Sequence, residues 1–127
     1  MEINKFVREA HENAVKHGWW EKPPSFGETV ALCHSELSEA LEEYRGGMPM
    51  AYVEDSSGDQ FGSWIPEENP EKWKGKKPEG VAVEMADCMI RIMDWFGSHP
   101  ELDLEAILAA KHAYNKGRSY RHDGKLL

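Results

Sequence analysis

Two short acidic motifs contain the side chains of this sequence that are best placed to do chemistry. Glu36 and Glu39 lie three positions apart, and the same spacing separates Glu84 from Asp87. Residues three apart project from the same side of an α-helix, so each motif would present two carboxylates together. The residues that flank both motifs include apolar ones at positions that a helix buries. Both carboxylate pairs are therefore expected at the border of a core.

Carboxylates that converge in a partly desolvated site repel one another, so such a cluster needs a cation. Oxygen ligands without histidine or thiolate favour Mg²⁺, with Mn²⁺ as a substitute, over zinc. The same spacing also occurs among ordinary solvated helix charges, and 30% of the residues in this chain are charged. The spacing alone leaves both a divalent metal site and a solvated helix face open.

Four segments with helical periodicity position these motifs, and no segment shows the alternating pattern of a strand. The expected helices cover about residues 4–17, 25–45, 78–96 and 104–116. The second helix opens on Ser25 and Glu28, the pattern of a capping box, and the third opens near Pro78, a residue suited to a first turn. The sequence predicts an all-α four-helix bundle in a single domain over residues 1–127.

The segment between the second and third helices, residues 48–77, is rich in Gly, Pro, Ser and charged residues. It also contains large apolar side chains, namely Tyr52, Phe61, Trp64, Ile65 and Trp73. A plain linker would not hold so many of them. We therefore expect this long irregular excursion to be a packed loop or a lid.

The overall charge and hydropathy exclude several classes of partner. The chain has 15 Lys and Arg against 23 Asp and Glu, a formal net charge of −8, which disfavours binding to a nucleic-acid polymer. No apolar run approaches the ~20 residues that span a bilayer, and the N-terminus has no apolar signal segment. Cys33 and Cys88 lie in apolar helical patterns, which favours reduced thiols. We expect a cytoplasmic protein without a membrane partner.

The acidic motifs and their flanks resemble the MazG-like, all-α nucleoside triphosphate pyrophosphohydrolases. The similar stretches are residues 18–20, 32–42, 83–94 and 115–125. This resemblance implies a bundle of the MazG-like type and Mg²⁺-dependent cleavage of a (deoxy)nucleoside triphosphate between its α- and β-phosphates. The products would be the nucleoside monophosphate and pyrophosphate. It also implies self-association, because bundles of this superfamily typically form dimers or tetramers.

The resemblance assigns roles to the four acidic residues. Glu36, Glu39, Glu84 and Asp87 match the metal ligands of the family. Glu36 and Glu39 are also the candidate catalytic residues, with Glu39 as the general base that accepts a proton from the attacking water. The pattern departs from the family at Ser35, where many relatives have a further acidic residue. It also departs in the length of the 48–77 segment.

Substrate contacts are expected at two places. Trp19 and Trp20 lie between the first two helices, where related enzymes hold the base, and an aromatic face there can stack on it. The alternative is a hydrophobic plug over one end of the bundle. Related proteins use Asn and Lys near the C-terminus for the phosphates, and the candidates here are Asn115, Lys116, Arg118 and Arg121. For these residues the alternative is a helix C-terminus that favours cations through its dipole.

Arg91 comes four residues after Asp87 and is expected to pair with that carboxylate or with Asp94.

The alternative function is a non-catalytic module that keeps the fold and binds a nucleotide or a protein. A purely structural acidic helical protein is a third interpretation.

Overall fold

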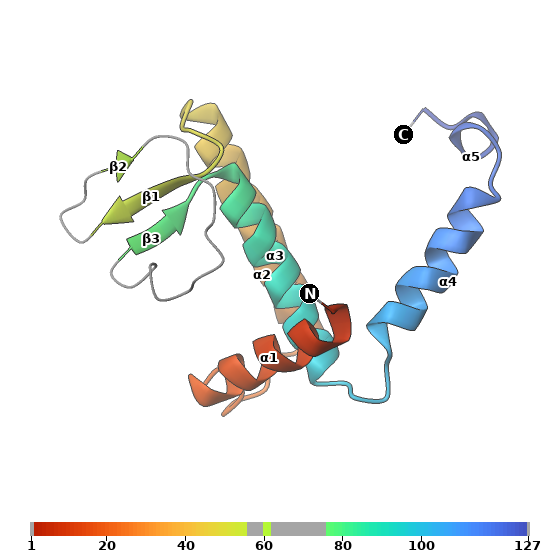
Figure 1. Ribbon diagram of the computed structural model, residues 1–127, viewed down its shortest axis with the longest axis horizontal. Helices are drawn as coiled ribbons and strands as arrows, with labels where there is room; N and C mark the ends of the chain where they lie inside the picture. The colour runs from red at the N-terminus through yellow and green to blue at the C-terminus, as the bar shows by residue number, and fades with distance from the viewer. Residues whose placement is uncertain (1, 56–59, 62–75, 127) are drawn as a thin grey trace.

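The computed structural model describes residues 2–55, 60–61 and 76–126, and this part of the chain is mainly helical, as predicted (Figure 1). The helices are α1 (Ile3–Lys16), α2 (Phe26–Arg45), α3 (Val81–Gly97), α4 (Leu104–Lys116) and the short α5 (Arg121–Gly124). The strands are β1 (Tyr52–Asp55), β2 (Gln60–Phe61) and β3 (Lys76–Glu79). In this part of the chain no helix has the length and apolar content needed to cross a bilayer.

Helices α2 and α3 lie side by side and form the centre of the molecule, and α1 packs across the lower part of α3 (Figure 1). The approach of α1 to α3 is close at Gly97, where an added Cβ would collide with the side chain of His11. Small residues such as Ala10, Ala40 and Cys88 are buried along these contacts. They allow α2 and α3 to approach closely enough for polar side chains on one helix to reach the other.

The predicted capping box is present at the start of α2. The Ser25 hydroxyl accepts a hydrogen bond from the Glu28 amide at 3.1 Å, and the Glu28 carboxylate accepts one from the Ser25 amide at 3.2 Å. These bonds satisfy amide groups that a helix start leaves without partners. The cap fixes the residue at which α2 begins. The buried residues of this helix are Glu36 and Ala40.

The prediction that the chain has no strands is wrong. Strand β1 pairs in antiparallel fashion with β2 and with β3, and Val53 lies opposite both Phe61 and Pro78. Pro78 is therefore a strand residue and not the first turn of a helix, and α3 begins at Val81. The strands are too short, and too rich in charge and proline, to show a clear alternation. Pairing between distant segments forms them.

The described part of the 48–77 segment is packed against the helices. Tyr52 is 4% exposed, and its hydroxyl donates to both carboxylate oxygens of Glu43 on α2 at 3.1 Å. Between β3 and α3, Gly80 has a φ of +112°, and a Cβ there would lie 2.5 Å from the Met50 carbonyl oxygen. This turn therefore requires glycine. Trp64, Ile65 and Trp73, on which part of the packed-loop prediction rests, lie outside the described residues.

Helix α4 extends away from the other helices as an arm (Figure 1). Its start is held to α1, because the Asn4 side chain donates to Asp103 and the Asn4 amide donates to Glu105, both at 2.9 Å. Beyond this point its apolar residues Ile107 and Leu108 are 43% and 46% exposed. A single chain thus shows three packed helices and a C-terminal arm, which we define as residues 104–126.

Candidate metal centre and adjoining groove

Carboxylates from both acidic motifs come together between α2 and α3. One oxygen from each of Glu36, Glu39 and Glu84 lies within 4.8 Å of the others, and we call these three residues the acidic cluster. Glu36 is 7% exposed and Glu84 is 9% exposed, whereas Glu39 is open to solvent. The side-by-side packing of α2 and α3 makes this convergence possible, since each helix supplies one buried carboxylate.

Asp87 lies at the edge of the acidic cluster and does not belong to the group of three. It is half-buried, and burial together with the negative charge of Glu36 raises the pKa of its carboxyl group. A further carboxylate approaches from the small sheet. Glu79 on β3 is 9% exposed, and its charge also raises the pKa of Asp87. Glu79 was not predicted as a site residue, because it lies in a strand and belongs to no helical motif.

Crowding of the carboxylates changes their protonation. Burial, followed by hydrogen bonds to Glu36 and Glu39, raises the pKa of Glu84 to about 8. Glu84 is therefore protonated at neutral pH. Burial also works to raise the pKa of Glu36, but hydrogen bonds from Arg91 and from the neighbouring carboxyl groups outweigh it and lower that pKa. One proton and one guanidinium group thus offset part, but not all, of the negative charge of the three carboxylates.

Arg91 forms its ion pair across the helix interface. Its Nε donates to Oε1 of Glu36 at 2.7 Å. This corrects the predicted pairing with Asp87 or Asp94 on its own helix. The i, i+4 rule considers neighbours on one helix only, whereas the packing of α2 on α3 offers a nearby buried carboxylate that gains more from a cation.

The two cysteines are free thiols, of which Cys88 is buried and Cys33 is half-buried. Burial, and then the proximity of Cys88, raises the pKa of Cys33. Both observations fit core residues without a reactive thiolate.

A groove of about 520 Å³ adjoins the cluster. It is bounded by α1, by the connection between α1 and α2, and by the facing parts of α2 and α3. Glu36, Asp87 and Arg91 line it, so the groove reaches the acidic cluster. The aromatic residues in its lining are Trp19, Trp20 and Trp95.

The two adjacent tryptophans have different roles in the groove. Trp20 is half-buried, and its indole Nε1 donates to both carboxylate oxygens of Asp94 at 3.0 and 3.2 Å. His11 supports the same carboxylate, with its Nδ1 2.8 Å from Asp94 Oδ1, and its ring meets Trp20 edge-on at 5.0 Å. Trp19 is 72% exposed. Hydrogen bonding therefore holds Trp20 in place as a wall of the groove, whereas most of the Trp19 side chain is exposed to solvent.

Asp94 and His11 were not predicted as site residues, although the sequence contains a signal for Asp94. Asp87, Arg91 and Asp94 follow one another at intervals of four and three residues, which places them on one face of α3. Three charged residues on one face of a helix whose mean hydropathy is apolar indicate a polar site. No comparable signal exists for His11, because its partner lies on another helix.

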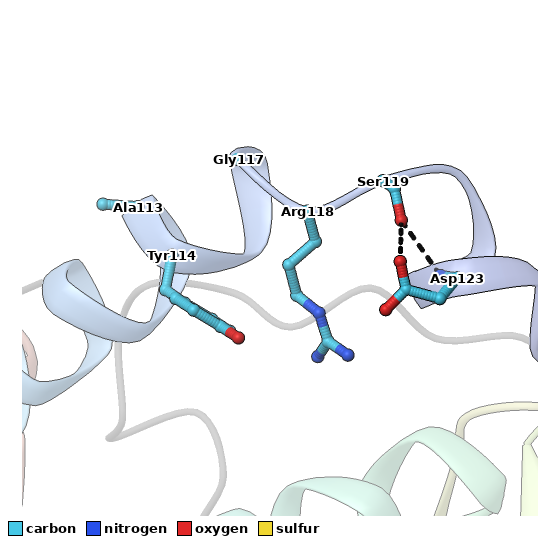
Figure 2. Close-up of a pocket in the computed structure, with 6 residues that line it drawn as sticks. All are labelled: Ala113, Tyr114, Gly117, Arg118, Ser119 and Asp123. Atoms are coloured by element: carbon cyan, nitrogen blue, oxygen red, sulfur yellow. Dashed lines mark hydrogen bonds between the residues drawn. The ribbon is translucent and has the colours of Figure 1, made fainter.

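The predicted phosphate contacts are on the C-terminal arm, and none of them lines the groove of the described chain. These residues are Asn115, Lys116, Arg118 and Arg121. The arm itself forms a separate hollow of about 460 Å³. Figure 2 shows Arg118 beside Tyr114 in the lining of this hollow. The Arg118 guanidinium lies 5.6 Å from the centre of the Tyr114 ring, and Ser119 donates to Asp123 at 2.7 Å. One chain does not bring its basic arm to its own acidic cluster.

Comparisons of the chain with known protein families, with curated proteins and with solved structures give no match. The functional assignment therefore depends on the geometry of the acidic cluster and the groove, together with the resemblance of the motifs.

Proposed function

We propose that this protein is a Mg²⁺-dependent nucleotide pyrophosphohydrolase that converts a (deoxy)nucleoside triphosphate into the monophosphate and pyrophosphate. The observation that carries this proposal is a carboxylate cluster adjoining a tryptophan-lined groove of about 520 Å³. Grooves of roughly 300–1,000 Å³ are typical of small-molecule sites. The MazG-like resemblance of both acidic motifs supports the same activity.

The donor set of the cluster fits a hard divalent cation. The converging atoms of Glu36, Glu39 and Glu84 are all carboxylate oxygens, which suit Mg²⁺ and Mn²⁺. These three residues would hold the ion, and Asp87 lies beside them to take part. When bound, Mg²⁺ would neutralise charge on the substrate phosphates.

The residues of the chain would divide the remaining work between them. Glu39 is open to solvent beside two buried carboxylates, so it can accept the proton of a water molecule that attacks the α-phosphorus. The new P–O bond forms as the bond to the bridging oxygen breaks, and pyrophosphate leaves. Trp19 can stack on the base, a contact worth ~1–3 kcal/mol, against the fixed wall of Trp20.

We also propose that the active form is a dimer or tetramer of this chain. Several large apolar side chains of the helices are exposed in a single chain, among them Leu41 and Met89 at 56% exposure each and Ile107 at 43%. Apolar residues so exposed on α2, α3 and α4 favour an interface over a free surface.

Association would also support the arm and complete the site. An isolated helix of 13 residues is marginal in water, so α4 needs a partner surface beyond its first turn. The arm carries Lys116, Arg118 and Arg121, and the cluster is acidic, so opposite charges favour the arm of one copy near the cluster of another. In that arrangement the predicted phosphate contacts would come from a neighbouring copy.

The activity can be tested by incubating the protein with a panel of nucleoside triphosphates and Mg²⁺, with the products followed by ³¹P NMR. We expect monophosphate and pyrophosphate. Glu36→Gln should lower the rate by about 100-fold or more, because it removes a ligand charge. Glu12→Gln, on the exposed side of α1, is the matched control and should keep the wild-type rate.

Three results would contradict the proposal. Activity that persists in EDTA would exclude the metal mechanism, and a fully active Glu36→Gln variant would exclude the cluster. Nucleotide binding without turnover across the panel would favour the alternative function, a non-catalytic binding module.

A further inference from the structure

Arg91 is a cation that already occupies the acidic cluster. Its Nε lies 2.7 Å from Oε1 of Glu36, a carboxylate that the packing of α2 on α3 has largely removed from water. The side chain of Arg91 is 38% exposed and lines the groove. The Arg91 side chain thus contacts Glu36, a proposed metal ligand, and also lines the groove in which the substrate is proposed to bind.

A guanidinium group and a divalent cation stabilise a buried carboxylate in the same way, by supplying positive charge at short range. The guanidinium group and a divalent ion cannot both bind Glu36 at full strength, because a carboxylate that coordinates a metal ion has less negative charge left for a second cation. A divalent ion at the cluster would weaken the bond from Arg91. The partly exposed arginine would then be free to turn toward the groove.

The chemistry of arginine suits the second position. Its planar fork of N–H donors matches phosphate oxygens in a two-point contact, and it keeps its charge at any physiological pH. Lys22 is the other basic residue that lines the groove in the described part of the chain, and it comes from the connection between α1 and α2. Arg91 contacts the cluster directly, through Glu36.

We propose that Arg91 is an exchangeable counter-ion, paired with Glu36 until a divalent cation binds the acidic cluster and then turned to the phosphates of the incoming nucleotide. This inference rests on the proposed function, and it names a residue that couples metal binding to nucleotide binding. The inference predicts that loss of the Arg91 charge strengthens binding of the divalent cation and weakens binding of the nucleotide.

The test measures the affinity for Mn²⁺ alone, by electron paramagnetic resonance of the free ion, and then the affinity for a non-hydrolysable nucleoside triphosphate at saturating Mn²⁺. Arg91→Met keeps the apolar stem and removes the charge. It should tighten Mn²⁺ binding roughly tenfold and weaken nucleotide binding by about tenfold or more. Arg91→Lys should bind nucleotide with an intermediate affinity, which covers the case in which Arg91→Met does not fold. Arg45→Met is the matched control, since Arg45 forms a 3.0 Å pair with Glu42 on the exposed side of α2.

A merely structural role for Arg91, as a support for Glu36, gives a different result. Arg91→Met would then weaken Mn²⁺ and nucleotide binding together, which would overturn the inference. Unchanged Mn²⁺ affinity would overturn it as well. These outcomes are separate from failure of the proposed function. If the wild type hydrolyses nucleotides but Arg91→Met does not change the two affinities in opposite directions, only the inference about Arg91 is refuted. If Arg91→Met does change the two affinities in opposite directions but the wild type does not hydrolyse any nucleotide, only the proposed activity is refuted.

Discussion

The protonation of Glu84 makes the stability of the metal-free protein depend on pH in an unusual direction. Burial and the hydrogen bonds to Glu36 and Glu39 raise its pKa from the usual 4.5 to about 8. Between these two values, the folded state binds a proton that the unfolded state has released. Stability must then fall as the pH rises through this window. Most paired carboxylates give the opposite trend, because their pKa is lowered by folding.

The size of the effect follows from the two pKa values of Glu84. One proton more in the folded state corresponds to a slope of roughly 1 kcal/mol per pH unit, so stability should fall by about 2 kcal/mol between pH 6 and pH 8. Glu84→Gln replaces the protonated carboxyl with a neutral amide of similar shape. This variant should lose that part of the slope and should exceed the wild type in stability at the upper end of the range.

Urea unfolding at half-unit pH steps, with EDTA present and at constant protein concentration, measures this difference. Titratable groups away from the cluster contribute equally to wild type and variant, so the difference between the two curves isolates Glu84 and its neighbours. Glu12→Gln should follow the wild-type curve. Parallel curves for wild type and Glu84→Gln would show that Glu84 is ionised in the folded protein, and the described electrostatics of the cluster would be refuted.

Three further predictions concern the backbone, the start of α2 and the apolar surface. Gly80→Ala should cost about 2 kcal/mol or more, because its Cβ would lie 2.5 Å from the Met50 carbonyl oxygen at a φ of +112°. Gly27→Ala should not, because its Cβ would make only an ordinary contact with the Ser25 hydroxyl oxygen at 3.9 Å; thermal unfolding compares the two variants. Ser25→Ala should cost about 1 kcal/mol in urea unfolding through loss of the cap, and an unchanged midpoint would contradict the role of the capping box. Leu41→Glu should shift the protein toward monomers in sedimentation velocity, and unchanged assembly would place the interface elsewhere.

Local signals in the sequence were sufficient to predict the helices that carry the acidic motifs. The capping box at Ser25 and the apolar periodicity placed α2 closely, and the periodicity placed α3 closely except at its start, because these signals depend on residues within one or two turns. The strand that contains Pro78 was not predictable in the same way. It exists because β1 and β3 pair over a long separation in the chain, and such pairing leaves little trace in a strand of four residues.

The contacts that make the site depend on tertiary packing. Arg91 meets Glu36 across 55 positions of the chain, and Trp20 meets Asp94 across 74. No spacing rule for a single helix reaches so far. Similarly, amphipathicity predicts that α4 has an apolar face, but it does not predict which surface packs against that face.

By itself the sequence determined on which side of its own helix each carboxylate lies, because this follows from the 3.6-residue repeat of the α-helix. The tertiary structure alone decided that Glu36 and Glu84 face one another, that Arg91 stands between the cluster and the groove, and that the basic arm extends away. The reason is physical: helical geometry is set by bonds within one turn, whereas the approach of two helices is set by the burial of side chains that are distant in the chain.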